Sequence, residues 1–300
     1  MKTTKINWKA SLWMLTTTMV LLFSCERGEV PTTEQELDSI QEPVSAEMKS
    51  ALFEMGLNGD TAIPISLRDD QNIPMEGFLV GGDIFMTHEE IMNPTYVDKK
   101  GAGTDKNYRT TNIVTQLPRT IKVVGIINTS KGLNNRERTA LRQAVNNYNR
   151  LNLDLSLSLS FKRQRGNADI AVSRDDQLLP PRFRNSPGGI AGFPNPNGDP
   201  FGLVRIFNTR PDLITPRQLR HVLTHELGHC LGLRHSDFRT RRSCGGARQN
   251  EGQAGVGAIP IPGTTPGYDP SSIMQACFGS ISTGRLNNND KTALRFLYKG

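Results

Sequence analysis

Residues 215–235, with the sequence TPRQLRHVLTHELGHCLGLRH, constrain the fold of this chain more than any other segment. Thr215 can cap a helix, Pro216 suits the first helical position, and Gln218 can complete a capping box. Gly232 can adopt the left-handed backbone that ends a helix and turns the chain. The sequence therefore predicts a helix between Thr215 and Gly232. Its buried side would consist of Leu219, Val222, Leu223, Leu227 and Leu231.

Within this helix, His225 and His229 are candidate metal ligands. Residues four apart project from one face, so the two imidazoles lie side by side and can each give one nitrogen to a zinc ion. His235 can return after the glycine turn as a third ligand, and Glu226 lies beside the pair without being a ligand. Three protein ligands leave a fourth position for water, which is typical of a catalytic zinc site.

The motif HExxHxxGxxH formed by these residues resembles that of the metzincin metallopeptidases. The resemblance implies a methionine-containing turn beneath the metal, and Met274 in the run SSIMQ fits that turn. The implied fold is α/β (α+β), with a mixed twisted sheet, an active-site helix, the Met-turn and a C-terminal helix. Among metzincins, the runs HELGHCLGLRHSD and IPGTTPGYDPSSIM and a lipoprotein signal resemble the bacterial dual-action HEIGH metallopeptidases.

This resemblance implies a zinc-dependent endopeptidase whose substrate lies along an upper edge strand. A zinc-bound water would attack the peptide bond, with Glu226 as general base. Astacin-type relatives carry a tyrosine where this chain has Ala276, so another transition-state partner is needed, and Tyr268 is a candidate. Asp237 could orient a ligand imidazole or form a local salt bridge. The alternative function is a catalytically silent surface-binding lipoprotein on the same scaffold.

The N-terminus has the features of a secretory signal, with a basic start and an apolar stretch at residues 10–23. The stretch ends in Leu22-Phe23-Ser24-Cys25, which resembles a bacterial lipobox. We expect cleavage before Cys25, lipidation of Cys25 and anchoring in the bacterial cell envelope, at the periplasmic face or the cell surface. A plain signal peptide or a single anchor helix is the alternative. Removal of residues 1–24 lowers the net charge from +7 to +4.

The mature chain divides into a lipidated cysteine with a flexible tether (25–44), an N-terminal region (45–118) and a catalytic domain (119–300). The N-terminal region is either a pro-segment that occludes the zinc or a permanent part of the fold. It contains no cysteine, which excludes a thiolate switch, and Asp83 or another carboxylate could serve as an inhibitory ligand. We expect helices at 45–57, 134–148 and 287–298, strands at 77–86, 120–128, 153–161 and 168–173, a linker at 93–112, and an edge strand leading into a further strand within 188–208.

Three cysteines remain beyond the lipidation site. A bridge between Cys244 and Cys277 would pin the floor of the metal site and leave Cys230 as a buried thiol, although spacing does not fix the pairing. Five arginines lie between positions 234 and 248, and we interpret them as a solvated loop, with a preference for acidic substrates as the alternative. Without interleaved aromatics they do not indicate a nucleic-acid partner. We expect a monomer that acts on protein or peptide substrates.

Overall fold

The computed structural model describes residues 44–68, 74–94, 106–183, 185–245, 250–252 and 254–300, which fall within the unit Glu42–Gly300. The predicted signal, Cys25 and nearly all of the tether lie outside the described residues. Within them, no helix is both long enough and apolar enough to cross a bilayer.

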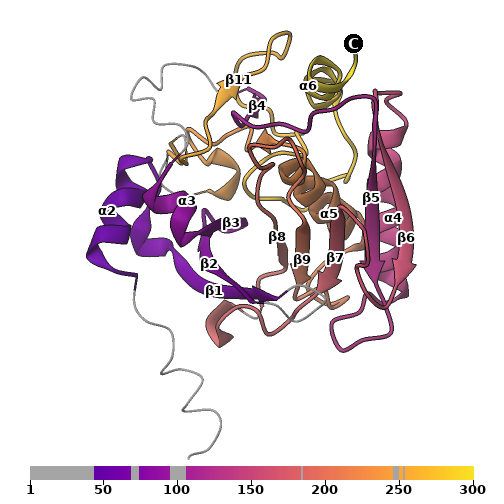
Figure 1. Cartoon of the computed structure of the whole chain (residues 1–300), viewed down its shortest axis with the longest axis horizontal. Coiled ribbons are helices and arrows are strands. Elements are labelled where there is room, and N and C mark those ends of the chain that lie inside the picture. Colours follow the sequence, from indigo (N-terminus) through magenta and orange to yellow (C-terminus); the bar gives the residue numbers. More distant parts are fainter. Residues whose placement is uncertain (1–43, 69–73, 95–105, 184, 246–249, 253) are drawn as a thin grey trace, which may run out of the picture. The chain divides into compact units, whose positions relative to one another are not determined.

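A five-stranded sheet forms the centre of the fold (Figure 1). Its order is β6-β5-β7-β9-β8, and all neighbours are parallel except β8, which runs antiparallel to β9 at one edge. The predicted mixed sheet is therefore confirmed. The strands are β5 (Arg119–Ile126), β6 (Leu155–Lys162), β7 (Ile170–Arg174), β8 (Gly188–Ile190) and β9 (Leu203–Phe207).

Three helices pack on one face of this sheet: α4 (Asn135–Asn149), α5 (Pro216–Cys230) and α6 (Asn288–Tyr298). Each begins with a capping box, in which the N-cap side chain accepts from the third helical N–H and the third side chain accepts from the N-cap backbone. The predicted start of α5, with Thr215 as cap and Pro216 in the first turn, is confirmed.

The two faces of β5 show how the sheet is covered on both sides. Ile121 and Val123 point toward the helices, whereas Val124 and Ile126 point toward the opposite face. There they meet apolar side chains of the N-terminal region, among them Ile65. The N-terminal region therefore buries one side of the central sheet.

The N-terminal region builds its own antiparallel sheet, of order β1-β2-β3. The expected single strand at 77–86 is wrong: Gly81 and Gly82, with φ of 63° and 99°, turn the chain there and split the segment into two strands of a hairpin. β1 was not expected from the sequence. The elements are α2 (Ala46–Glu54), the 3-10 helix η1 (Gly59–Thr61), β1 (Ile63–Arg68), β2 (Pro74–Val80), β3 (Ile84–Thr87) and α3 (His88–Met92).

A third, small sheet joins the chain on either side of the active-site helix. β4 (Tyr108–Arg109) pairs with both β10 (Leu233–Arg234) and β11 (Ile259–Pro260). The expected linker at 93–112 is therefore wrong for its last residues, because their backbone groups are hydrogen-bonded to the segment that follows α5. Two further 3-10 turns are η2 (Pro181–Phe183) and η3 (Arg242–Cys244).

Candidate metal centre

Helix α5 and the turn after it bring three histidines together. His225 and His229 lie four residues apart on α5, and Gly232, with φ of 95°, lets the chain turn back so that His235 faces them. The side chains of all three are at least 94% buried. The structure therefore places the three sequence-predicted ligands in one group.

Each imidazole is fixed through its Nδ1 atom. His225 contacts the carbonyl oxygen of Ile273 at 2.8 Å, and His229 contacts that of Leu233 at 2.8 Å. His235 contacts the Glu251 carboxylate at 2.7 Å. Carbonyl and carboxylate oxygens accept, so Nδ1 donates in each contact, and Nε2 is the atom of each ring that would bind a metal ion.

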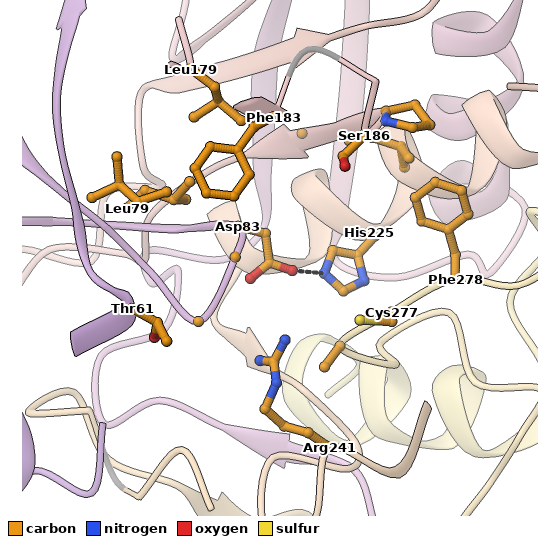
Figure 2. Close-up of a pocket in the computed structure, with 18 of the residues that line it drawn as sticks. Thr61, Leu79, Asp83, Leu179, Phe183, Ser186, His225, Arg241, Cys277 and Phe278 are labelled. Atoms are coloured by element: carbon orange, nitrogen blue, oxygen red, sulfur yellow. Dashed lines mark ion pairs between the residues drawn. The ribbon is translucent and has the colours of Figure 1, made fainter. Parts of the chain in front are cut away.

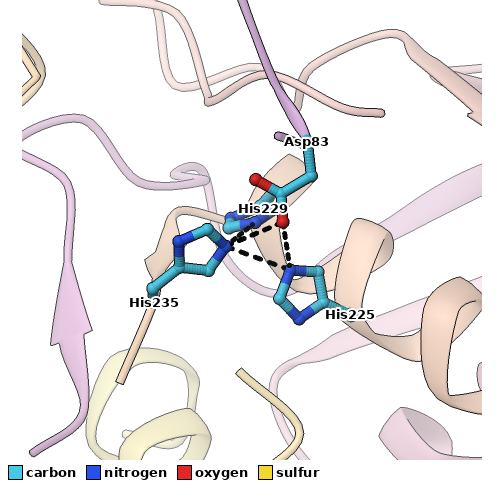
Figure 3. A group of neighbouring side chains, drawn as sticks. All are labelled: Asp83, His225, His229 and His235. Carbon is cyan, nitrogen blue, oxygen red and sulfur yellow. Dashed lines mark hydrogen bonds and ion pairs between the residues drawn. The ribbon is translucent and has the colours of Figure 1, made fainter. Parts of the chain in front are cut away.

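The three Nε2 atoms converge on one point (Figure 3). The Nε2 atom of His235 lies 3.2 Å from that of His229 and 3.3 Å from that of His225. Nitrogens bound at about 2.0–2.1 Å to a tetrahedral zinc ion are themselves about 3.3 Å apart. The donor type, the fixed ring orientations and the spacing all fit a metal ion held by these residues.

Asp83 completes the group from the turn between β2 and β3. Its Oδ2 atom lies 3.0 Å from Nε2 of His235 and 3.3 Å from Nε2 of His225. Burial raises the pKa of Asp83, but His235 and His225 outweigh this and hold it well below its usual range. For the His235 imidazole, burial alone would lower the pKa, but the neighbouring carboxylates of Asp83 and Glu251 outweigh burial and raise the pKa to about 10. The centre is therefore electrostatically suited to a cation.

Glu226 lies next to the ligand pair and is 2% exposed. Its side chain packs against Gly189 of β8, where an added Cβ would come within 2.6 Å of the Glu226 Cγ atom. Its Oε2 atom has no hydrogen-bond partner among the described residues. Burial, followed by the Asp83 carboxylate, raises the pKa of Glu226 well above its usual range. The side chain therefore takes up a proton more readily than an exposed glutamate would.

Glu251 is a functional candidate that the sequence analysis missed. It is 3% exposed, accepts from His235 and is paired with two buried cations, Arg234 at 3.6 Å and Arg241. The expectation of a solvated arginine loop is wrong for these two residues, since Arg234 is fully buried and Arg241 is largely so. Their charges hold Glu251 ionised, because His235, Arg241 and Arg234 together outweigh burial and lower its pKa.

We expect Glu251→Gln to lower the metal affinity of the chain about 10–100-fold, because an amide holds the His235 ring less firmly and makes it less basic. Competition with a chromophoric chelator measures this affinity. The matched control is Glu54→Gln, which removes an exposed carboxylate of α2. An affinity equal to that of the unaltered chain would show that Glu251 does not position His235.

Met274 lies directly beneath the active-site helix and is fully buried. An added Cβ at Gly228 would come within 2.6 Å of its Sδ atom, which shows how closely the turn approaches the helix. Asp237 fixes the chain around this turn: its two oxygens accept from the backbone N–H groups of Ala276 and Ser243, at 2.9 and 2.8 Å. Asp237 therefore supports the floor of the site through backbone contacts, while Glu251 is the carboxylate that orients an imidazole.

Cys244 and Cys277 form a disulfide, and Cys230 is a free, buried thiol. The bridge joins η3 to the residues that follow the Met-turn. It lies close to the Asp237 contacts, because Ser243 also donates its N–H to Asp237 and accepts from the N–H of Cys277. The disulfide and Asp237 therefore hold the same two segments together.

A cavity of about 920 Å³ opens over His225 and Glu226. Figure 2 shows Asp83 reaching into it toward His225, with Leu79, Leu179 and Phe183 to one side and Phe278 to the other. Residues of both the N-terminal region and the catalytic part line this cavity. It is large enough to hold several side chains of a peptide.

The structure does not bring Tyr268 to this cavity: its ring faces the Arg242 guanidinium at 4.7 Å and does not line the opening. His221, by contrast, lines the cavity beside His225, with the ring centroids 6.1 Å apart, and is 4% exposed. Burial, followed by His225, lowers the pKa of His221 to about 3, so its imidazole is neutral.

The class of metal-dependent peptidases is defined by three features that this chain has: a mixed sheet, a helix that presents two histidines to a third, and an adjacent buried glutamate. A sequence profile of the dual-action HEIGH metallo-peptidases matches residues 78–298, and the chain belongs to this family. The protein is therefore a metallopeptidase, and the family resemblance drawn from the sequence is confirmed.

Among solved structures, two of myroilysin are similar to this chain. The first is 14% identical in sequence with a TM-score of 0.40, and the match covers 64% of this chain and 98% of the myroilysin chain. The second is 14% identical in sequence with a TM-score of 0.39, and the match covers 63% of this chain and 86% of the myroilysin chain. No curated protein matches the chain.

Proposed function

We propose that the metal is zinc and that the protein is a metzincin-type endopeptidase with Glu226 as its general base. The observation that carries this proposal is the convergence of three imidazole Nε2 atoms beside the buried Glu226 carboxylate, which lies outside the group of candidate ligands. Imidazole is a preferred zinc donor, and His225, His229 and His235 would hold the ion. When bound, zinc makes water a nucleophile near neutral pH and polarises the scissile carbonyl.

The residues of the chain carry the proton transfers. Glu226 accepts a proton from the attacking water and returns it to the leaving amine, a role that its raised pKa supports. Gly189 lets the edge strand approach the Glu226 side chain closely and so fixes where the carboxylate points. Apolar side chains, including Phe183 and Phe278, line the cavity next to these groups, where a bound peptide would displace water.

The substrate would lie along β8, the edge of the central sheet nearest the metal centre. An edge strand offers unpaired backbone groups that can bind an extended peptide by adding a strand. Gly188 and Gly189 of β8 line the cavity that also contains His225 and Glu226. A peptide bound along β8 would have its backbone beside the proposed catalytic groups.

Chelator-sensitive cleavage of casein or fluorogenic peptides by the purified chain tests this proposal against the catalytically silent alternative. The silent scaffold would bind a metal without cleaving any peptide. Intact Glu226 and an intact set of three histidines favour catalysis.

For the N-terminus we propose a lipoprotein anchored through Cys25 to a bacterial membrane, on the strength of the lipobox-like run that ends at this residue. Mass spectrometry of the mature N-terminus is expected to find an acylated Cys25 as the first residue. Detergent extraction of the same sample should release the intact protein from membranes. An unmodified Glu26 or an intact Met1 at the N-terminus would contradict the proposal.

We also propose the division into a tether, an N-terminal region and a catalytic domain, with one change to where the N-terminal region ends. Residues 106–118 pack with the catalytic part, because β4 pairs with β10 and β11 and because Thr110 donates its N–H to Gly232. A removable N-terminal segment would therefore end before Tyr108. Sequencing the N-terminus of the active form distinguishes removal of this segment from its permanent retention.

A further inference from the structure

We propose that a second cavity, lined by cations from α4, α5 and α6, is a binding site for an organic anion that carries at least two phosphate groups. The cavity has a volume of about 540 Å³, which suits a ligand of the size of a phosphorylated sugar. Its lining residues are all different from those of the cavity over His225. The inference therefore goes beyond the proposed peptidase function and does not depend on it.

Five cationic side chains from separate parts of the chain line this cavity. Arg150 is the C-cap of α4, Arg220 lies in α5, and Arg285 precedes α6. Lys291 and Arg295 lie four residues apart and so project from one face of α6. The described residues that line the cavity include no aspartate or glutamate. Positive charge is thus concentrated in a concave site, where it attracts anions.

The chain itself does not neutralise these charges. Among the described residues, none of the five cations forms an ion pair, whereas other cations, such as Arg119 and Lys131, do. Asp290 is next to Lys291 in the sequence, but it is fully buried and accepts from the backbone N–H of Ile273 at 2.9 Å. The cavity therefore keeps its positive charge for a partner from outside the chain.

The Arg220 guanidinium is held in place at the cavity. Its Nη2 atom donates to the carbonyl oxygen of Thr283, and an added Cβ at Gly284 would come within 2.7 Å of its Nε atom. This Nε atom is buried without a hydrogen-bond partner in the described part of the chain. Burial, followed by the charges of Arg285 and Arg217, lowers the pKa of Arg220. An anion bound beside the guanidinium would offset this unfavourable environment.

The groups in the cavity match a phosphorylated sugar or polyol. Guanidinium groups offer paired N–H donors that fit phosphate oxygens, and five cations call for more negative charge than one carboxylate supplies. The exposed amides of Gln143 and Asn146 can form hydrogen bonds with hydroxyl groups. Leu151 and Leu286 are buried and supply the apolar part of the lining. Such a ligand can be free in solution or the headgroup of a lipid.

The test measures binding of fructose 1,6-bisphosphate by isothermal titration calorimetry to the mature chain without its lipid, residues 26–300. The cavity variant combines Arg285→Gln, Lys291→Gln and Arg295→Gln. In the described part of the chain these three side chains have no ion pair or hydrogen bond, so the fold should tolerate their replacement. We expect the cavity variant to bind the bisphosphate about 10–100-fold more weakly than the unaltered chain.

A control variant removes the same amount of charge away from the cavity. It combines Lys122→Gln, Lys162→Gln and Arg163→Gln, at exposed positions in or next to β5 and β6. Thermal unfolding first verifies that both variants are folded. The control variant should bind the bisphosphate within about twofold of the unaltered chain, because charges far from the site are screened.

The number of phosphate groups is tested with fructose 6-phosphate, which carries one. It should bind the unaltered chain at least about tenfold more weakly than the bisphosphate. Equal affinity for the two sugars would overturn the inference. Failure of the unaltered chain to bind the bisphosphate would also overturn it, as would equal binding by the unaltered chain and the cavity variant.

A second arm identifies the source of the phosphate groups. Flotation with phosphatidylcholine vesicles, with or without phosphatidic acid, measures binding to lipid. Binding to phosphatidic acid that the cavity variant loses and the control variant keeps would support the site with a lipid headgroup as its ligand. Bisphosphate binding that depends on the cavity, without such vesicle binding, would support it with a soluble ligand.

Discussion

Glu226→Gln is expected to lower the rate of peptide cleavage about 10²–10⁴-fold while the metal content stays at one ion per chain. Glutamine keeps the shape of the side chain and its packing against Gly189, but it cannot accept a proton from water. Because Glu226 is not part of the ligand group, the three histidines should hold the metal as before. The effect should appear in kcat, with little change in KM.

The measurement is steady-state cleavage of one fluorogenic peptide, with metal content determined on the same sample. The substitution is made in the otherwise unaltered chain. Glu89→Gln, at an exposed position of α3, is the control and should leave the rate unchanged. Cleavage by Glu226→Gln within threefold of the parent would show that another group is the base.

His229→Ala is expected to abolish stoichiometric metal binding and, with it, all cleavage. His229 is fully buried, and its ring is locked by the Leu233 carbonyl, so the remaining side chains cannot move to replace the lost nitrogen. Metal binding to the folded chain stabilises it by about 4 kcal/mol when the metal is present at about 1,000 times its dissociation constant. The variant should lose this stabilisation.

Thermal unfolding with and without added zinc measures the effect. Zinc should raise the Tm of the unaltered chain and leave that of His229→Ala unchanged. His88→Ala, which removes an exposed histidine at the start of α3, should behave like the unaltered chain. An equal zinc-dependent rise in Tm for His229→Ala would place the metal elsewhere.

The helix that carries two of the histidines was predictable because its signals are local. The N-cap, the proline of the first turn, the four-residue spacing of the histidines and the terminating glycine all lie within residues 215–235. The same holds for α4 and α6, each of which begins with a capping asparagine. Short-range hydrogen bonds and side-chain spacing determine such elements.

The partners of His235 were harder to predict because they are set by tertiary contacts. Asp83 is separated from His235 by 152 positions, and the sequence analysis could name it only as one carboxylate among others. Glu251 lies in a segment whose residues follow neither a helical nor a strand periodicity. In the sequence it was distinguished only as an acidic residue close to several arginines. Burial of Arg234 follows from that pairing, since a cation can be buried when a carboxylate and carbonyl oxygens surround it.

Local signals also failed where glycine changes the direction of the chain. The run at 77–86 has the composition of one strand, yet Gly81 and Gly82 place a turn at its centre. That turn is what aims Asp83 at the histidines. The same turn therefore explains both the wrong prediction of a single strand and the position of Asp83 at the metal centre.

Zinc-dependent cleavage is tested by a zinc titration of the metal-free chain, with bound zinc and peptide cleavage followed in parallel. It is performed on the unaltered chain and on Glu226→Gln. We expect cleavage by the unaltered chain to rise in proportion to bound zinc and to stop rising at one equivalent per chain, and Glu226→Gln to bind the same amount of zinc with far slower cleavage. Cleavage that persists in the fully metal-free chain, or an unaltered chain filled with one zinc ion that cleaves no peptide, would contradict the assignment of a zinc peptidase.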